Sequence, residues 1–219
     1  MQNRIIHKKA KGKNHSGAVV CGPGNKPVAE DPFLQFTRWF ADAGKKGNKE
    51  PGAMHLSTCG KNGRPSGRMV LLKNVDSSGF VFFTNYESRK GKQIAENGFV
   101  ALTFFWPETE RQVRIEGKAT KVTARESDKY FFSRPLESRM SACISPQSKV
   151  ISDRETLEKK WQQLMERSDS KGLKRPSGWG GYRVVPSRFE FWQGREHRLH
   201  DRYLFRKKRG GWIMEILAP

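Results

Sequence analysis

Hydrophobic positions near the start of the chain recur with helical spacing. Five of them share one helical face: Phe33, Phe36, Trp39, Phe40 and Ala43. Asp31-Pro32 supplies an N-cap residue followed by a proline at the first helical position, and Gly44 ends the pattern. We therefore expect a helix that begins at Pro32 and packs its aromatic face on a large apolar surface.

Beyond this helix, short runs with strand patterning alternate with turn sequences. The predicted strands are residues 53–59, 66–75, 80–84, 99–106, 112–122, 182–192, 202–206 and 212–217. Asn62-Gly63, between the first two, is a strong hairpin signal. Short connections favour antiparallel pairing, and several strands are apolar on both faces, as a closed barrel with packed helices requires.

Further helices punctuate the strands. One is expected from Ser88 to Asn97, and two follow the capping boxes Thr123-Ala-Arg-Glu126 and Ser152-Asp-Arg-Glu155. Residues 1–30 are Lys-rich and lack a sustained apolar period, so we predict a flexible basic N-terminal arm. Residues 31–219 then form one α+β, mainly β domain, an antiparallel barrel of six to eight strands with packed helices.

Composition narrows the class of protein. The 219 residues contain no window close to 18 consecutive apolar residues and no secretory signal, although the basic leader leaves organellar targeting open. Three cysteines without a CxxC motif indicate reduced thiols and a cytoplasmic setting. The five histidines form no zinc pattern, so we predict no metal site.

The chain is strongly basic, with 42 Lys and Arg against 22 Asp and Glu and a formal net charge of +20. Such an excess fits nucleic-acid binding, but no nucleic-acid recognition motif is visible. It fits equally well the binding of small phosphorylated molecules by Lys and Arg. Charge alone does not choose between these two interpretations.

Several segments combine cations with polar or aromatic residues. Arg68-Met-Val-Leu-Leu-Lys73 has a cation at each end of an apolar strand. Tyr86-Glu-Ser-Arg-Lys-Gly-Lys92 places Arg89 and Lys90 in the first turn of a predicted helix, where positive side chains oppose the helix dipole. A phosphate bound at this helix start would offset that unfavourable interaction. Charged strand ends and a solvated charge run explain the same segments without a ligand.

Two further groups carry candidate chemistry. Tyr130, Arg134 and Ser138 are spaced four residues apart across Pro135 and suit one anion, or an exposed helix cap. Arg198 and His200 lie two residues apart, so on an extended chain both would point into one pocket. A cation beside a histidine suits an anionic ring oxygen or developing charge; the alternative is a basic β-hairpin.

Several motifs in consistent order resemble the pyridoxine (pyridoxamine) 5′-phosphate oxidase family. They are Arg68-Met-Val-Leu-Leu-Lys73, Phe83-Thr-Asn-Tyr-Glu-Ser-Arg-Lys90, Arg111-Gln-Val-Arg-Ile-Glu-Gly117, Tyr130-Phe-Phe-Ser-Arg-Pro135, Gln147-Ser148, Trp179-Gly-Gly-Tyr182, Glu190-Phe-Trp-Gln-Gly194, Arg198-Leu-His-Asp-Arg202 and Leu217-Ala-Pro219. The resemblance implies an FMN-binding split barrel that works as a homodimer with the flavin at the subunit interface.

The resemblance also implies roles by position. FMN would be bound by Arg68, Met69, Val70, Leu71, Leu72, Lys73, Phe83, Thr84, Arg89, Lys90, Gln112, Gln147, Ser148, Trp192 and Arg202. The substrate would be bound by Lys73, Tyr130, Arg134, Ser138, Arg198, Leu199 and His200. Arg198 and His200 form the implied catalytic pair, which orients and polarises the substrate while the flavin performs the redox chemistry.

The implied reaction converts pyridoxine 5′-phosphate or pyridoxamine 5′-phosphate to pyridoxal 5′-phosphate in vitamin B6 metabolism. A hydride passes to the flavin, dioxygen is the acceptor, and hydrogen peroxide is the by-product. Family members usually carry an N-terminal Tyr and Arg that fold over the substrate, but residues 1–30 contain no Tyr. The resemblance therefore leaves lid closure, substrate affinity and turnover open, while FMN binding is still expected.

Three other hypotheses compete with the oxidase. One is a non-catalytic module that holds flavin or pyridoxal phosphate, one is nucleic-acid binding through the basic surface, and one keeps the FMN barrel but changes the substrate. We expect a homodimer with small-molecule substrates, no membrane and no specific nucleic acid.

Overall fold

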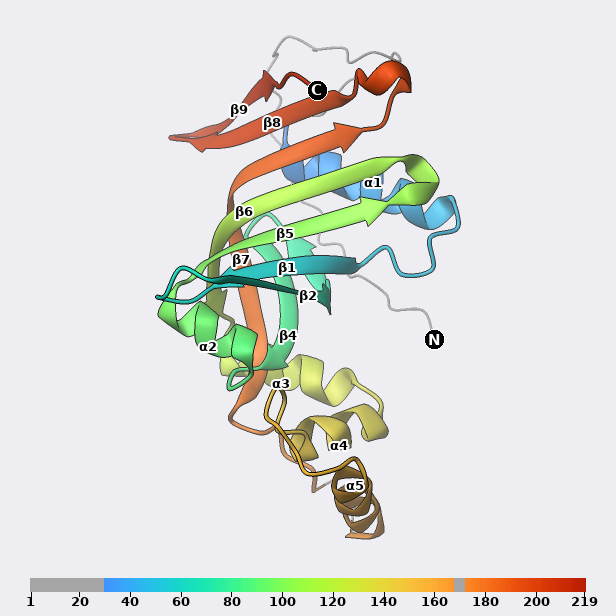
Figure 1. Cartoon of the computed structure of the whole chain (residues 1–219), viewed down its shortest axis with the longest axis vertical. Coiled ribbons are helices and arrows are strands. Elements are labelled where there is room, and N and C mark those ends of the chain that lie inside the picture. Colours follow the sequence, from blue (N-terminus) through green and yellow to red (C-terminus); the bar gives the residue numbers. More distant parts are fainter. Residues whose placement is uncertain (1–29, 168–171) are drawn as a thin grey trace.

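A single antiparallel sheet forms the frame of the protein. The computed structural model describes residues 30–167 and 172–219, so the predicted arm lies outside the described residues except for Glu30. In this part of the chain the sheet has nine strands in the order β2-β1-β5-β6-β7-β4-β3, with β8 on β7 and β9 on β8 (Figure 1). The strands are β1 (Ala53–Cys59), β2 (Pro65–Leu71), β3 (Asn74–Asp76), β4 (Gly79–Asn85), β5 (Phe99–Trp106), β6 (Arg111–Lys121), β7 (Trp179–Gln193), β8 (Asp201–Lys208) and β9 (Gly211–Ile216).

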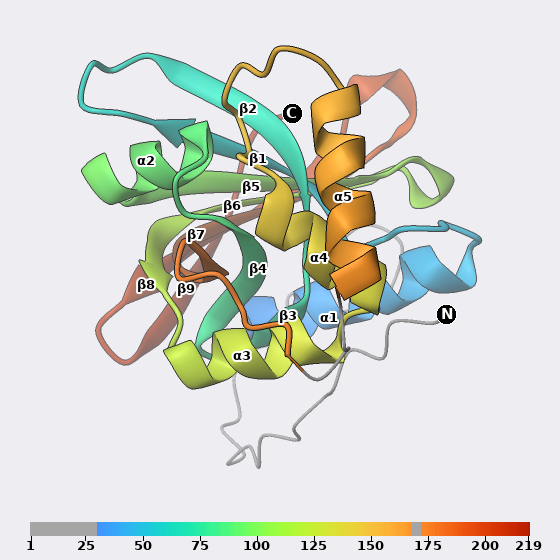
Figure 2. The ribbon, with the colours of Figure 1, turned by 90° about the horizontal axis from the view of Figure 1, so that it is seen from below.

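Helices cover the sheet at two places. Helix α1 packs on the core, while the others gather at the opposite end of the molecule, where Figure 2 shows them in front of the sheet. The α-helices are α1 (Pro32–Lys45), α2 (Arg89–Glu96), α3 (Ala124–Ser133), α4 (Leu136–Ile144) and α5 (Glu155–Arg167). Two short 3-10 helices, η1 (Pro107–Thr109) and η2 (Glu196–Arg198), lie in turns.

Helix α1 confirms the prediction from the hydrophobic pattern. The Asp31 carboxylate accepts a hydrogen bond of 2.8 Å from the Phe33 amide, which caps the helix. Phe36 is fully buried and makes edge-on ring contacts with Phe80 and Phe104 of the sheet. The helix therefore closes the aromatic core that lies against the curved sheet.

The strand predicted for residues 66–75 is divided in two, because the chain changes partners at Leu72. The Leu72 amide donates to the Gly52 carbonyl, and the next amide, that of Lys73, donates to the Val81 carbonyl. Strand β2 therefore ends on β1, and β3 begins on β4. No ladder joins β2 to β3 among the described strands, so the barrel is split rather than closed.

The sheet curls where β6 crosses β7. A β-bulge interrupts their register between Glu116 and Gly117. A Cβ atom at Gly117 would lie 2.3 Å from the Val185 carbonyl oxygen, so only glycine allows the two backbones to approach. This bend lets the first half of β7 pair with β4 and its second half with β8.

The two predicted capping boxes have different outcomes. Thr123 and Glu126 form the predicted reciprocal hydrogen bonds at the start of α3. At α5 the prediction from Ser152 and Glu155 is wrong: the Asp153 carboxylate accepts from the Thr156 amide instead. A carboxylate one residue later reaches the free amides of the first turn and outcompetes the serine hydroxyl.

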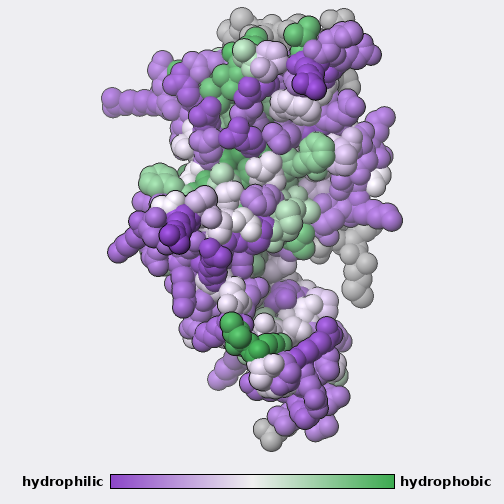
Figure 3. Space-filling model, in the orientation of Figure 1, coloured by the Kyte–Doolittle hydropathy of each residue, from purple (hydrophilic) through white to green (hydrophobic). Residues whose placement is uncertain are grey.

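Exposed apolar side chains lie on the outer face of the sheet. Met69 and Leu71 of β2 and Phe99 and Phe105 of β5 are all exposed, Met69 by 62 %. Figure 3 shows hydrophobic residues in green across the middle of this face, with smaller green patches among hydrophilic residues toward both ends. Among the described helices, none is both long and apolar enough to cross a membrane.

Candidate functional site

Arg68 is held in a fixed position between β1, β2 and α2. Its guanidinium donates hydrogen bonds to the Thr58 hydroxyl at 2.5 Å, to the Ser66 hydroxyl at 2.6 Å and to the Leu56 carbonyl at 3.2 Å. Both hydroxyls in turn donate to Gln93 Oε1 at 2.7 Å. The network uses neutral acceptors only, so the positive charge of Arg68 is oriented but not neutralised.

Lys90 lies beside this network and is buried. Its ammonium donates to Gln147 Oε1 at 3.0 Å and to the hydroxyls of Thr84 and Ser88 at 3.2 Å. Burial, with the nearby charge of Arg68, lowers the pKa of Lys90 to about 8. Loss of hydration without a counter-ion explains this direction, and a bound anion would reverse it.

The start of α2 adds donors to the same place. Ser88 caps the helix through the Gly91 amide, and the exposed Arg89 occupies the first helical position. Burial, followed by the charge of Arg89, lowers the pKa of Arg68. Arg68, Arg89 and Lys90 thus form one basic group at a helix N-terminus, where the dipole also favours a bound anion.

A second basic group lies where α3 meets α4. The predicted interruption at Pro135 is confirmed: α3 ends at Ser133, Arg134 is its C-cap, and α4 carries Ser138 in its first turn. Burial lowers the pKa of Lys73, with Glu50 opposing that change and Arg134 adding to it. Lys73 and Arg134 are therefore close enough for their charges to interact.

Aromatic rings support this second group. The Arg134 guanidinium lies over the Trp179 ring at 4.9 Å. Phe83 stacks on Tyr130 with ring centroids 3.9 Å apart and on Trp179 at 5.6 Å. The partly buried Phe83 ring therefore packs against these two aromatic side chains.

Three predicted residues, Gln112, Trp192 and Arg202, form a third set in one row across β6, β7 and β8, and Phe105 of β5 continues the row. Phe105 is opposite Gln112, Gln112 is opposite Trp192, and Trp192 is opposite Arg202. Directly opposed residues point to the same face of a sheet. The Trp192 ring contacts the His200 ring at 4.7 Å, which adds the histidine to this row.

Arg202 differs from the cations above because a buried carboxylate holds it. Glu190, only 5 % exposed, accepts from Arg202 Nε at 3.0 Å and Nη2 at 2.8 Å, and from Arg114 Nη1 at 3.1 Å. Arg202 Nη1 also donates to the Ala218 carbonyl at 2.8 Å. These bonds fix the Arg202 plane and attach the C-terminal residues to β8.

The extended backbone predicted for Arg198 and His200 is wrong. Residues Glu196–Arg198 form η2, and His197 and Arg198 have φ angles of 56° and 61°. The Arg195 amide donates to His200 Nδ1 at 3.1 Å, and this bond closes the loop and turns the histidine toward Trp192. Non-glycine residues at positive φ store local strain, which is common at functional sites.

The other predicted residues fall into the same regions. Arg68 and Val70 are half-buried and Leu72 is buried, whereas Met69 and Leu71 face outward, as the strand alternation predicts. Ser148 follows Gln147 with a φ of 73°. Leu199 is 68 % exposed beside Arg198.

The third set comes from strands that do not pair with β2. In the sheet order β2 and β7 are four strand steps apart, roughly 19 Å along the sheet at about 4.8 Å per step. Gln112, Trp192 and Arg202 belong to β6, β7 and β8, whereas Arg68 belongs to β2.

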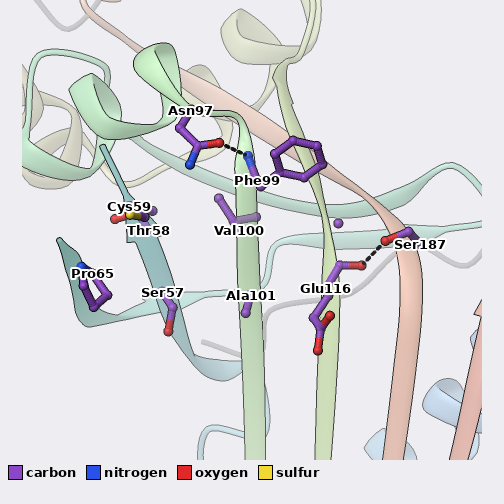
Figure 4. A pocket seen from close by; sticks show the side chains of 11 residues that line it. Ser57, Thr58, Cys59, Pro65, Asn97, Phe99, Val100, Ala101, Glu116 and Ser187 are labelled. Carbon is purple, nitrogen blue, oxygen red and sulfur yellow. Dashed lines mark hydrogen bonds between the residues drawn. The ribbon is translucent and has the colours of Figure 1, made fainter. Parts of the chain in front are cut away.

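A separate pocket of about 340 Å³ opens on the outer face of the sheet (Figure 4). Ser57, Phe99, Ala101 and Glu116 are among its lining residues. None of the site residues predicted from the sequence lines it.

Sequence reasoning missed the residues that support the site. Arg68 is oriented by Thr58 and, through it, by Gln93. Glu190 orients Arg202, and the Arg134 guanidinium packs over the Trp179 ring. Trp179 and Glu190 belong to two motifs that resemble the family, but those motifs imply no ligand-binding role for them. Thr58 and Gln93 carry no local signal, because only the folded sheet brings them to Arg68.

Comparisons with known proteins agree with this description. The chain matches the family described as pyridoxamine 5′-phosphate oxidase over residues 40–167, and the pyridoxine 5′-phosphate oxidase C-terminal dimerisation region over residues 179–219. Pyridoxine/pyridoxamine 5′-phosphate oxidase of Burkholderia ambifaria is 53 % identical over 195 residues, 88 % of this chain and 91 % of that protein. The enzyme of the same name from Trichormus variabilis is 53 % identical over 193 residues, 88 % and 90 % of the two chains.

Two solved structures are similar. PhzG of Burkholderia lata, in complex with tetrahydrophenazine-1-carboxylic acid, has a TM-score of 0.83 and 32 % identity over 87 % of this chain and 94 % of its own. A pyridoxamine 5′-phosphate oxidase-related, FMN-binding protein of Nostoc punctiforme has a TM-score of 0.70 and 16 % identity over 87 % of this chain and 100 % of its own, a likeness of fold alone.

The fold and the family match together define an oxidoreductase of the split-barrel class. More specifically, the chain belongs to the pyridoxine/pyridoxamine 5′-phosphate oxidase family. Its C-terminal region is the family's dimerisation region, which points to a dimer.

Proposed function

We propose that this protein is an FMN-dependent oxidase that converts pyridoxine 5′-phosphate and pyridoxamine 5′-phosphate to pyridoxal 5′-phosphate, with dioxygen as acceptor and hydrogen peroxide as by-product. One observation carries the proposal. Two basic groups, Arg68 with Lys90 and Lys73 with Arg134, form no salt bridge among the described residues. A phosphorylated cofactor and a phosphorylated substrate require two such groups.

The first group fits the phosphate of FMN. Arg68 and Arg89 offer guanidinium donors, Lys90 offers a buried ammonium, and the start of α2 offers backbone amides. When bound, FMN supplies the two-electron chemistry by accepting a hydride from the substrate and passing the electrons to dioxygen. Gln147 and Thr84 keep the Lys90 ammonium in place for this ligand.

A second copy of the chain completes the flavin site in this proposal. Gln112, Trp192 and Arg202 come from β6, β7 and β8, which are three, four and five strand steps from β2, or roughly 14, 19 and 24 Å along the sheet at about 4.8 Å per step. The exposed apolar side chains of β2 and β5, Met69 and Leu71 among them, suit a subunit interface. The C-terminal dimerisation region supports the same arrangement.

The second group fits the phosphate of the substrate. Lys73, Tyr130, Arg134 and Ser138 surround the junction of α3 and α4 and would bind it. Arg198 and His200 would then hold the pyridine ring. Because His200 Nδ1 accepts from the Arg195 amide, its neutral ring carries the proton on Nε2, which is left to donate to a ring substituent.

A second candidate function is oxidation of a carboxylate-bearing polycyclic compound. The likeness to PhzG, whose structure contains tetrahydrophenazine-1-carboxylic acid, favours it. Two or more cations around the substrate site suit a dianionic phosphate better than a single carboxylate. We therefore rank the phosphorylated substrates first.

The test is formation of peroxide and pyridoxal 5′-phosphate by the purified, FMN-loaded protein in air. Pyridoxamine 5′-phosphate, pyridoxine 5′-phosphate and a dihydrophenazine carboxylic acid are supplied in turn. Stoichiometric peroxide and pyridoxal phosphate are expected with the first two. Turnover of the third compound alone would establish the second candidate, and bound flavin without any product would favour a non-catalytic binding module.

A further inference from the structure

Two guanidinium nitrogens are buried without a hydrogen-bond acceptor. They are Arg134 Nη1 and Arg139 Nε, and in the described part of the chain no other buried side-chain nitrogen or oxygen lacks a partner. A buried, unsatisfied donor costs about 1–3 kcal/mol, and more when it is charged. Such donors in a native fold call for an acceptor that is not part of the described chain.

Both nitrogens belong to the same place in the fold. Arg134 is the residue that ends α3, and Arg139 lies in α4 directly after Ser138. Burial raises the pKa of the Cys143 thiol, and the charges of both arginines oppose that rise. Cys143 is one helical turn beyond Arg139, so the thiol, Arg139 and Arg134 are neighbours.

The positive charges here extend to the substrate site. Arg134 also acts on Lys73, which places three cations around the α3–α4 junction. None of the three forms a salt bridge within the described ranges. The Cys143 sulfur satisfies neither nitrogen, and its thiol donates to the Lys174 carbonyl at 3.7 Å.

We propose that Arg139 is a further substrate-binding residue, whose guanidinium contacts the phosphate alongside Arg134 and makes the site selective for a dianionic phosphate over a carboxylate. This inference rests on the proposed function, since it names a residue of the same site. A phosphate has three terminal oxygens, enough to accept from Lys73, Arg134 and Arg139 together. A carboxylate carries a single negative charge, so it compensates three cations less well than a dianionic phosphate does.

The test compares Arg139→Gln and Arg139→Lys with wild type in the FMN-loaded protein. Two quantities are measured: kcat and KM for pyridoxamine 5′-phosphate, and inhibition by inorganic phosphate and by acetate. Arg139→Gln is expected to raise KM and the phosphate inhibition constant at least tenfold, with kcat, flavin content and acetate inhibition within twofold of wild type. Arg139→Lys keeps the positive charge but loses the two-pronged guanidinium, so we expect KM and the phosphate inhibition constant to rise threefold to fivefold. Arg125→Gln, on the exposed start of α3, is the matched control.

Each outcome bears on the proposal. Wild-type phosphate inhibition in a flavin-loaded Arg139→Gln protein overturns it, and so does a change confined to dimer dissociation, because the acceptor would then be the partner chain. If Arg139→Gln does not fold, wild-type phosphate inhibition in Arg139→Lys overturns it equally. If wild type oxidises no vitamin B6 phosphate but binds inorganic phosphate through Arg139, the proposed function fails while the phosphate site stands.

Discussion

Basic residues are used in opposite ways at the two ends of this molecule. We call Arg114, Glu190 and Arg202 the paired cluster, because a buried carboxylate neutralises both guanidinium groups. The unpaired cluster comprises Arg68, Lys73, Arg89, Lys90, Arg134 and Arg139, which have no salt bridge within the described residues. Both clusters carry residues predicted to bind the same ligands, so the difference is one of role.

The comparison separates orientation from charge complementarity. Glu190 fixes the direction of Arg202 and cancels much of its charge, which suits hydrogen bonding to a neutral or delocalised part of a ligand. Arg68 and Lys90 are fixed by neutral hydroxyl and amide oxygens, so their charge remains available for a phosphate. A basic sequence alone does not show which of its cations are neutralised in the fold.

The largest effect, a loss of turnover, is expected at Arg198. This arginine lies near the paired cluster but forms no salt bridge among the described residues. If Arg198 polarises the substrate, Arg198→Ala lowers kcat by about 10²–10³, the usual cost of removing one charge-stabilising donor. Flavin content, read from the visible spectrum, stays at the wild-type level. Turnover within twofold of wild type would remove Arg198 from the catalytic pair.

The unpaired cluster is tested by measuring how tightly its variants bind FMN. Arg89→Ala combined with Lys90→Ala removes two charge-assisted bonds of about 1.5–3 kcal/mol each, which raises the FMN dissociation constant roughly 100-fold or more. Flavin fluorescence titration of the stripped protein measures the change. Lys92→Ala is the control, since Lys92 is exposed on the same helix. Equal flavin retention in both variants contradicts the assignment.

The paired cluster is expected to respond in stability. Glu190→Gln leaves Arg114 and Arg202 without their buried counter-charge and lowers the free energy of unfolding by about 3 kcal/mol. Glu215→Gln breaks the exposed pair with Arg206 and costs at most about 1 kcal/mol. Urea unfolding of the two variants gives both values. If Glu190→Gln and Glu215→Gln lose the same free energy of unfolding, the burial of Glu190 adds nothing to the stability of its ion pairs.

The sequence predicted more of the fold than of the site. Helix α1, the hairpins and the break at Pro135 follow from local signals, namely a cap, Asn62-Gly63 and proline geometry. The change of partner at Leu72 was missed, because it depends on which strand is nearby and not on the local pattern. The α5 cap was missed because two oxygen side chains compete for the same amides.

At the site, residue types were predictable and their environments were not. Motif order singled out Arg68, Lys90 and Arg202 as candidate ligand-binding residues. Only the tertiary structure distinguishes a cation held by Gln147 from one neutralised by Glu190. The backbone at Arg198 is a similar case. Its positive φ is unfavourable for a non-glycine residue and is imposed by the closed loop, so strand periodicity led to the wrong prediction.

The smallest effect is a pH dependence that only the unpaired cluster should show. In the proposed function, the FMN phosphate binds the charged form of Lys90, whose pKa is lowered by burial to about 8 in the ligand-free protein. Raising the pH above 8 removes this proton, so affinity falls by up to about tenfold per pH unit. Ligand-free stability changes in the opposite direction: between about pH 8 and 10.4 the unfolded chain holds the extra proton, so stability rises with pH.

Lys90→Arg separates the contribution of Lys90 deprotonation from other pH effects, because a guanidinium keeps its charge from pH 7 to 10. FMN dissociation constants measured from pH 7 to 10 should diverge between wild type and this variant above pH 8, while the Lys92→Arg control follows wild type. The phosphate is already dianionic at pH 7, so its own titration does not contribute. Parallel curves for wild type and Lys90→Arg would mean that Lys90 is neutralised by a group of the protein and belongs with the paired cluster.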